Sequence, residues 1–466
     1  MKDMSYQALM GRKNEIMKAA VGLDYSRFEL SGLAFNYEAM MAAPGLDLAQ
    51  IAAVQRDYAI GNTPLIELKN ITALARALAP SGMGARIFVK DEACNPSGSF
   101  KARRAALSVY TARKLGYKGV VTATSGNYGA AVASCAAKAG LNCIVVQECF
   151  DSRGVGQPEI VEKARKCEAF GAEVLQLSVG PELFYVFLRL LEDTGYFNAS
   201  LYTPYAILGI QTLGAEIAKQ CRAQLGRDPD IVVCTNAGGG NLTGTAQGLK
   251  ALGCHAQTVA ASVNLKGLHM ASDEQFNRKS FTTGHTGFGM PFASWPDRSD
   301  VPRSAARPLR YMDSYYTVTQ GEVFFMTETL AALEGMERGP AGNISLAAAF
   351  SLAQTMPANQ MIVVQETEYT GAGKHHNAQL AFARSQGIDI RFGDPQDEIP
   401  GQSIVLPQAP EMIQAQKIDL DHLRRSLIRK ATEGHTGVLS DQEITYLARE
   451  CNCDQDFVLS TYGEGL

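Results

Sequence analysis

Short apolar segments alternate with helix-length segments from about residue 86 to residue 365, and this alternation limits the fold more than any other feature. The apolar segments are residues 86–90, 119–123, 142–147, 173–177, 231–234, 258–263 and 361–365. The helix-length segments between them include residues 102–115, 127–138, 159–170 and 182–193. Continuous apolar strands that alternate with helices predict an α/β fold, in which helices cover both faces of a mostly parallel sheet.

The composition is that of a globular protein with a substantial core. Hydrophobic residues make up 46% of the 466 residues and charged residues 19%, which excludes a disordered chain, and the length predicts two or three domains. A net charge of −4 leaves no basic excess for a nucleic-acid surface. The uncharged segment 339–365 is interrupted by prolines and amides, so we interpret it as a helix, a turn and a strand rather than a membrane span.

The N-terminal residues and the cysteines both favour a cytoplasmic protein. The first residues lack the apolar stretch of a signal peptide. The ten cysteines are scattered without a CxxC pair, so we expect free thiols in a reducing compartment.

Four segments of the sequence contain candidate functional residues, and Lys101 is the last residue of the first one. Residues 95–101 (NPSGSFK) follow a predicted strand and open a predicted helix. Ser97 or Ser99 can cap this helix, which would place Lys101 in its first turn, against the positive end of the helix dipole. A partly desolvated lysine in that position would have a lowered pKa, as a Schiff-base amine requires, whereas the spacing alone favours a solvated lysine.

Three more predicted strands end in polar or glycine-rich segments: residues 124–129 (TSGNYG), 236–244 (NAGGGNLTG) and 366–376 (ETEYTGAGKHH). In open α/β sheets, ligands bind at the carboxyl ends of the strands. A glycine run that opens a helix predicts a phosphate cradle, although an unliganded glycine turn is the alternative. Thr243 replaces the third glycine of a dinucleotide fingerprint, and Asn264 stands near the place of its acid, so a single small phosphate fits better. His375 and His376 have no metal-ligand spacing around them, and we predict no metal site.

The order of these four segments resembles that of the fold type II pyridoxal-phosphate enzymes, a family that includes threonine synthase, cysteine synthase and the tryptophan synthase β-subunit. The resemblance covers about residues 61 to 373. It implies pyridoxal 5′-phosphate as the cofactor and two open, mostly parallel sheets with helices on both faces, extended by helices at both ends of the chain. Ala102 departs from the pattern, because many relatives have an acid after the lysine.

Site residues follow from this resemblance position by position. Lys101 becomes the Schiff-base lysine, and Asn127 the partner of the cofactor's ring hydroxyl. The remaining matches are the phosphate-binding residues and the hydroxyl residue that faces the pyridine nitrogen, namely Gly238, Gly239, Gly240, Asn241 and Thr370.

The resemblance also divides the chain into parts. Residues 1–60 would be a helical extension, and residues 61–90 with 206–393 a large cofactor-binding domain. Residues 91–205 would form a small inserted α/β domain that carries Lys101 and the loop from Ser125 to Asn127. Residues 394–466 would be a Pro- and Gln-rich linker followed by a helical appendage, with helices expected at 419–432 and 440–450.

Three segments resemble a narrower branch of the family, the β-subunits of amino-oxo-acid thiolases: KDEACNPSGSFKARRAA, QECFDSRGVGQPEIVEKARKCEAFGAEV and VCTNAGGGNLTGT. This resemblance implies cleavage of 2-amino-4-oxopentanoate by coenzyme A to acetyl-CoA and alanine. It also implies a small α-subunit as partner and a dimer of this chain. A threonine synthase-like lyase and a non-catalytic scaffold subunit are the alternatives.

Overall fold

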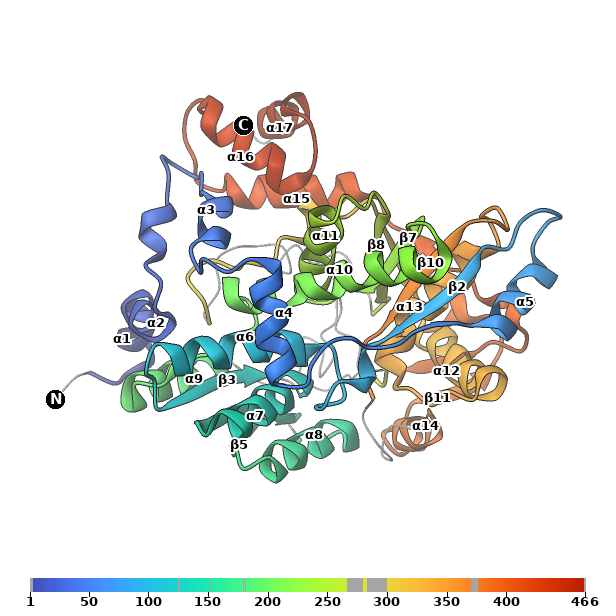
Figure 1. Cartoon of the computed structure of the whole chain (residues 1–466), viewed down its shortest axis with the longest axis horizontal. Helices are drawn as coiled ribbons and strands as arrows, with labels where there is room; N and C mark the ends of the chain where they lie inside the picture. The colour runs from blue at the N-terminus through green and yellow to red at the C-terminus, as the bar shows by residue number, and fades with distance from the viewer. Residues whose placement is uncertain are drawn as a thin grey trace.

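The computed structural model describes residues 3–124, 126–151, 153–178, 180, 182–265, 280–282, 300–369 and 376–464. Within these residues the chain forms two main sheets, one mostly and one wholly parallel, with helices on both faces of each, and a third sheet of two strands (Figure 1). The predicted α/β fold is therefore confirmed. No helix in the described part of the chain is both long enough and apolar enough to cross a membrane.

The larger sheet has the strand order β1-β2-β10-β7-β8-β9-β13. Its strands are β1 (Leu65–Glu67), β2 (Arg86–Asp91), β7 (Ile231–Thr235), β8 (Gln257–Val263), β9 (Ser314–Val318), β10 (Met361–Glu366) and β13 (Gln416–Lys417). The central strands are parallel, whereas β1 and β13 pair antiparallel at the two edges. Helices cover both faces of the sheet, which explains why its strands are continuous apolar runs and do not alternate with polar residues.

Five helices cover this larger sheet. Val232 and Cys234 of β7 pack against α10 (Pro204–Leu225) and α11 (Gly240–Ala251). Ile231 of the same strand points to the opposite face, which is covered by α5 (Lys69–Leu78), α12 (Gln320–Glu334) and α13 (Pro340–Ala353).

The smaller sheet is parallel throughout and has the order β5-β4-β3-β6. Its strands are β3 (Gly119–Thr124), β4 (Asn142–Phe150), β5 (Glu173–Ser178) and β6 (Phe197–Asn198). The chain leaves the larger sheet after β2, forms this sheet, and returns through α10 to β7. One face packs against α6 (Lys101–Lys114) and α7 (Asn127–Ala139), and the other against α1 (Tyr6–Gly11), α2 (Lys13–Val21) and α9 (Glu182–Thr194).

The remaining elements lie around these layers. They are α3 (Tyr37–Ala42), α4 (Leu48–Asp57), α8 (Pro158–Ala169), α14 (His376–Ser385), β11 (Asp389–Phe392), β12 (Ser403–Leu406), α15 (Leu420–Ala431), α16 (Asp441–Cys451) and α17 (Gln455–Gly463). The C-terminal helices, red in Figure 1, lie beside α11, and their leucines extend its apolar core. Glu450 of α16 links these helices to the segment that precedes β9, through ion pairs with Arg307 (2.7 Å) and Arg310 (2.6 Å).

Candidate active site

Three of the four predicted segments follow neighbouring strands. In the larger sheet β10 lies between β2 and β7, and all three strands run parallel. Their carboxyl ends therefore meet at one edge. The lysine segment follows β2 through a short 3-10 turn (η2, Glu92–Cys94), the glycine run follows β7, and residues 367–369 follow β10. The sheet order thus brings together segments that are far apart in the sequence.

Backbone hydrogen bonds join the lysine segment to the end of β10. The N–H of Phe100 donates to the carbonyl of Thr367 (3.1 Å), and the N–H of Tyr369 donates to the carbonyl of Gly98 (2.8 Å). Lys101 follows directly as the first residue of α6, which confirms its predicted place in the first helical turn. Thr370, the next residue after this pairing, lies outside the described residues, as does His375.

The helix that carries Lys101 has no serine cap. Its N-cap residue is Phe100, without a side-chain cap hydrogen bond, so the expectation that Ser97 or Ser99 caps the helix is wrong. The physical reason is that the loop backbone pairs with residues 367–369 instead. Both serine hydroxyls are buried and have no hydrogen-bond partner. They remain available to a ligand.

The glycine run opens α11 and brings bare backbone to the same edge. Gly239 is the N-cap residue with φ +78°, a conformation that glycine adopts without strain, and a Cβ there would lie 2.6 Å from Cδ of Pro308. A Cβ on Gly238 would overlap the hydroxyl of Tyr202. Asn241 donates from Nδ2 to Oε1 of Gln365 on β10 (2.7 Å), which ties the run to the central strand. The glycines thus let the side chains of Tyr202 and Pro308 approach the backbone closely at the start of α11.

Asn127 begins α7 at the end of β3, and Ser125 just before it lies outside the described residues. The Asn127 side chain is 6% exposed, and its Nδ2 has no hydrogen-bond partner. The neighbouring helix α8 closes over the two loops: Lys163 lies where a Cβ on Gly126 would be, and Lys166 donates to the carbonyl of Ser97 (2.7 Å). Burial lowers the pKa of Lys166.

Unpartnered polar atoms test whether these segments fit a cofactor. A buried polar atom left without a hydrogen bond costs about 1–3 kcal/mol, so native proteins keep few of them. Eight such atoms belong to the four segments. Two of them are the carboxyl oxygens of Glu366, and the other six are hydroxyl and amide atoms: Ser97 Oγ, Ser99 Oγ, Asn127 Nδ2, Tyr128 Oη, Asn236 Oδ1 and Asn241 Oδ1. A small ligand that has a phosphate and a polar ring matches this set of donors and acceptors.

The sequence model of one family, described as "Pyridoxal-phosphate dependent enzyme", matches residues 56–368. That match covers well over half of the chain and all of the segments after β2, β3 and β7. This chain belongs to the pyridoxal-phosphate dependent enzyme family. Its cofactor is pyridoxal 5′-phosphate, and the unpartnered atoms above fit that group.

Two relatives match this pyridoxal-phosphate dependent enzyme along almost its whole length. The 2-amino-4-ketopentanoate thiolase beta subunit of Acetoanaerobium sticklandii is 66% identical over 464 residues, 99% of each chain. A protein of the same name from an unknown prokaryotic organism is 60% identical over 461 residues, 98% of each chain. Among solved structures, a threonine deaminase from T.th. superposes with a TM-score of 0.52 at 25% identity, over 70% of this chain and 99% of that one.

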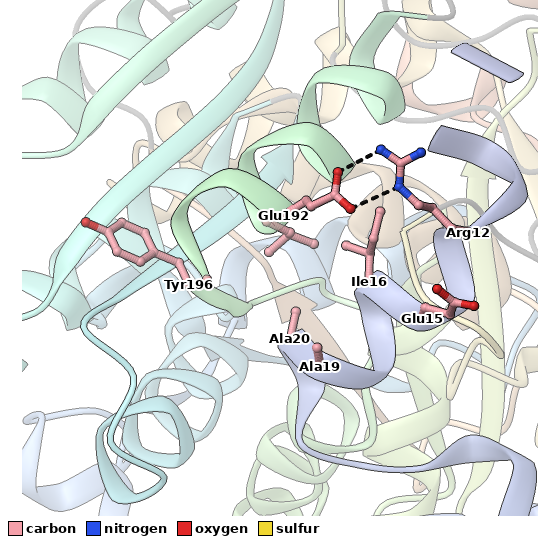
Figure 2. Close-up of a pocket in the computed structure, with 9 residues that line it drawn as sticks. Arg12, Glu15, Ile16, Ala19, Ala20, Glu192 and Tyr196 are labelled. Carbon is pink, nitrogen blue, oxygen red and sulfur yellow. Dashed lines mark hydrogen bonds and ion pairs between the residues drawn. The ribbon is translucent and has the colours of Figure 1, made fainter. Parts of the chain in front are cut away.

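A separate cavity of about 240 Å³ lies between α2 and α9. Figure 2 shows Arg12 and Glu192 at this cavity, joined by an ion pair of 2.8 Å. Its lining residues belong to the N-terminal helices and to the segment around α9, and none of them is in the four predicted segments. This cavity is therefore not the cofactor site.

Sequence reasoning missed four basic residues around the site. They are Arg103, Arg104, Lys163 and Lys166, which all lie on helices and which the sequence analysis did not single out. Arg103 and Arg104 are instead almost fully buried. The signal that could have found them is the RR pair in the first turn of a helix whose other residues are mostly small and apolar.

Proposed function

We propose that this chain is the catalytic β-subunit of an enzyme that cleaves 2-amino-4-oxopentanoate with coenzyme A, giving acetyl-CoA and alanine. The supporting observation is the 66% identity to a 2-amino-4-ketopentanoate thiolase beta subunit, which includes both flanks of the family's core. In the reaction the C3–C4 bond breaks and the acetyl group forms a bond to the thiol sulfur. The thiol proton is balanced by a proton gained at C3, which becomes the methyl group of alanine.

The bound cofactor supplies delocalisation of negative charge from the carbon next to the amino group. Lys101 holds the cofactor through its amine and, when released, moves a proton at that carbon. Asn127 orients the ring by donating its unpartnered Nδ2 proton to the ring oxygen. The backbone N–H groups of Gly238, Gly239 and Gly240, with Asn241, bind the phosphate at the start of α11. Thr370 is assigned to the pyridine nitrogen.

The same proposal divides the chain into a large domain (residues 61–90 and 206–393) and a small domain (91–205), with the site between them. The name of the relatives as beta subunits supports a second, different subunit as partner. We assign the partner as a small α-subunit and expect this chain to dimerise. We expect the partner to supply contacts to coenzyme A.

The test is an assay of the chain produced together with its α-subunit. We expect acetyl-CoA and alanine in equal amounts, and only when the amino-oxo acid, coenzyme A and both subunits are present. Release of phosphate from phosphohomoserine without coenzyme A would instead establish a threonine synthase-like lyase. In the Lys101→Ala variant, unchanged assembly with unchanged turnover would establish a scaffold subunit.

A second measurement tests the cofactor linkage by itself. Borohydride reduction of the holoenzyme, followed by proteolysis and mass spectrometry, should find the cofactor on the peptide that contains Lys101. Lys114, on the last turn of the same helix, is the internal control and should stay unmodified. A label on Lys114 or on no peptide would contradict the assignment of Lys101.

A further inference from the structure

Arg104 is a buried cation that has no carboxylate partner among the residues that the structure describes. Its side chain is 3% exposed, its Nε has no hydrogen-bond partner, and the hydrogen bond formed by its Nη1 is a long one of 3.4 Å to the carbonyl of Leu201. Burial lowers its pKa to about 10, and the charged or titratable groups that face it are the phenols of Tyr128 and Tyr202. These phenols do not neutralise a guanidinium.

The neighbouring buried arginines have such partners. Arg103 forms ion pairs of 2.7 Å with both Glu92 and Glu216, and Arg307 forms one of 2.7 Å with Glu450. Removing a charge from water costs several kcal/mol, and proteins normally offset that cost with an opposite charge. Arg104 therefore lies in a site that is electrostatically incomplete, and an anion would complete it.

The guanidinium of Arg104 points at the start of α11. A Cβ on Gly240, the first residue of this helix, would overlap Nη2 of Arg104 and lie 2.9 Å from its Cζ. Gly240 is thus needed for close approach of the guanidinium to the helix N-terminus, where unpaired N–H groups attract negative charge. Tyr202 lies against Gly238 in the same run. The guanidinium, a phenol and a helix N-terminus converge on one small space.

Arg104 also lies on the lysine's side of α6. It follows Lys101 by three residues, so the two side chains share a helix face. Both lie over the ring of Phe100. The distance to the ring centroid is 5.2 Å from Lys101 Nζ and 5.4 Å from Arg104 Cζ. A ligand that is bound covalently to Lys101 and extends to the glycine run would approach this guanidinium, because Arg104 Nη2 lies against Gly240.

We propose that Arg104 is a side-chain ligand of the cofactor's phosphate group and holds it in the dianionic form. The planar guanidinium can bind two phosphate oxygens at once, in addition to the backbone N–H groups of α11. An N–H cradle alone offers about half a positive charge from the helix, which is less than a dianion needs. This inference depends on the cofactor and not on the thiolase reaction, so each of the two can fail alone.

The test compares cofactor and phosphate-free analogue on the full apo chain. Titration should show that Arg104→Met binds pyridoxal 5′-phosphate about 10- to 100-fold more weakly than the parent chain, the loss expected for a charge-assisted hydrogen bond pair. Binding of pyridoxal, which has no phosphate, should change less than about twofold. Arg104→Lys should recover part of the loss. Arg113→Met is the matched control, because Arg113 lies on the same helix but is exposed, and it should change neither affinity.

Two further readouts separate a ligand from a structural residue. The phosphorus NMR resonance of the bound cofactor should be independent of pH near neutrality in the parent holoenzyme and should titrate in Arg104→Met. The apo form of the variant should unfold at the same or a higher temperature than the apo parent, because an uncompensated buried charge has been removed.

Three results would overturn the proposal. Equal affinity of the parent chain and Arg104→Met for the cofactor would show that Arg104 does not bind the phosphate. Equal losses for cofactor and pyridoxal would assign Arg104 a structural role. A higher KM for the amino acid or for coenzyme A with unchanged cofactor affinity would assign the guanidinium to a substrate anion. Should Arg104→Met fail to fold, the ratio of the two affinities in Arg104→Lys decides in the same way.

Discussion

Arg103 Nε lies 2.7 Å from Oε2 of Glu92, and both side chains are fully buried. Glu92 precedes the lysine segment and Arg103 follows it, so their ion pair closes the loop on which Lys101 lies. Arg103 also reaches Glu216 on α10 (2.7 Å). Burial alone would raise the pKa of Glu216, but the charges of Arg103 and Lys90 lower it to about 2. This buried network therefore holds the loop on which Lys101 lies.

Replacing Arg103 by Met should destabilise the protein strongly. Glu92 would lose its buried ion-pair partner and Glu216 would keep only Lys90, and breaking a buried pair in this way costs about 3–5 kcal/mol. We expect a clear drop in the unfolding temperature of the apo chain. Arg189→Met is the control, because its ion pair with Asp193 is exposed on both sides and contributes little to stability. Equal unfolding temperatures for the two variants would show that the network does not stabilise the loop.

The sequence predicted those parts of the fold that are set by local pattern. Every apolar segment singled out as a strand is a strand, because a continuous Val- and Ile-rich run has few other stable uses in an α/β chain. The strands β1, β6, β9, β11, β12 and β13 were not predicted. β9 (SYYTV) is largely polar and aromatic, and β1 and β13 have three and two residues. Their pairing depends on partners far away in the chain, which no local pattern encodes.

The candidate site shows the same division between local and long-range information. The four segments were found because glycine, proline and polar residues interrupt the periodic pattern at strand ends. The missing serine cap on α6 could not be foreseen, because it results from backbone pairing with Thr367 and Tyr369, which are distant in the sequence. The difference between Arg103 and Arg104 was equally invisible: one meets two carboxylates and the other none, and only the packing decides which.

Gly239→Ala should weaken cofactor binding. Alanine with φ +78° costs about 1–2 kcal/mol, and its Cβ would meet Pro308 Cδ at 2.6 Å, so the run must shift. We expect at least about a tenfold loss of affinity for pyridoxal 5′-phosphate, measured by titration of the apo chain. Gly253→Ala is the control beyond the other end of α11, because Gly253 has φ +62° but no atom within 4 Å of its Cβ. It should lower the unfolding temperature slightly without changing affinity; parallel losses of affinity in both variants would rule out a local effect.

Glu366 should make the protein less stable as the pH rises. Its side chain is fully buried, neither carboxyl oxygen has a hydrogen-bond partner, and burial raises its pKa well above the ordinary value, with Asp91 adding to the shift. A carboxyl with a raised pKa in the folded state contributes stability below its unfolded pKa of about 4.3 and loses it as the pH rises toward the folded value.

Glu366→Gln removes this charge, so the variant should match the parent near pH 4 and unfold at a higher temperature than the parent at pH 8. Thermal unfolding of the apo chains at both pH values measures the difference. Glu411→Gln, at an exposed position, is the control and should leave the pH dependence unchanged. A variant of Glu366 that is less stable than the parent at pH 8 would show that the ionised carboxylate has a partner in solution.

Asn127 should set the ionisation of the bound cofactor's ring oxygen. Its buried Nδ2 is a donor without a partner, and a donor that faces an oxygen favours the ionised form of that oxygen. A charge-assisted hydrogen bond of about 1.5–3 kcal/mol corresponds to a pKa change of roughly one to two units. In Asn127→Ala the pH midpoint of the cofactor's visible absorption should rise by that amount, with the cofactor still bound in equal proportion to chain. Asn142→Ala, at an exposed position on β4, should leave the midpoint unchanged. An unshifted midpoint in Asn127→Ala would show that Asn127 does not donate to the ring oxygen and that its buried amide serves another ligand.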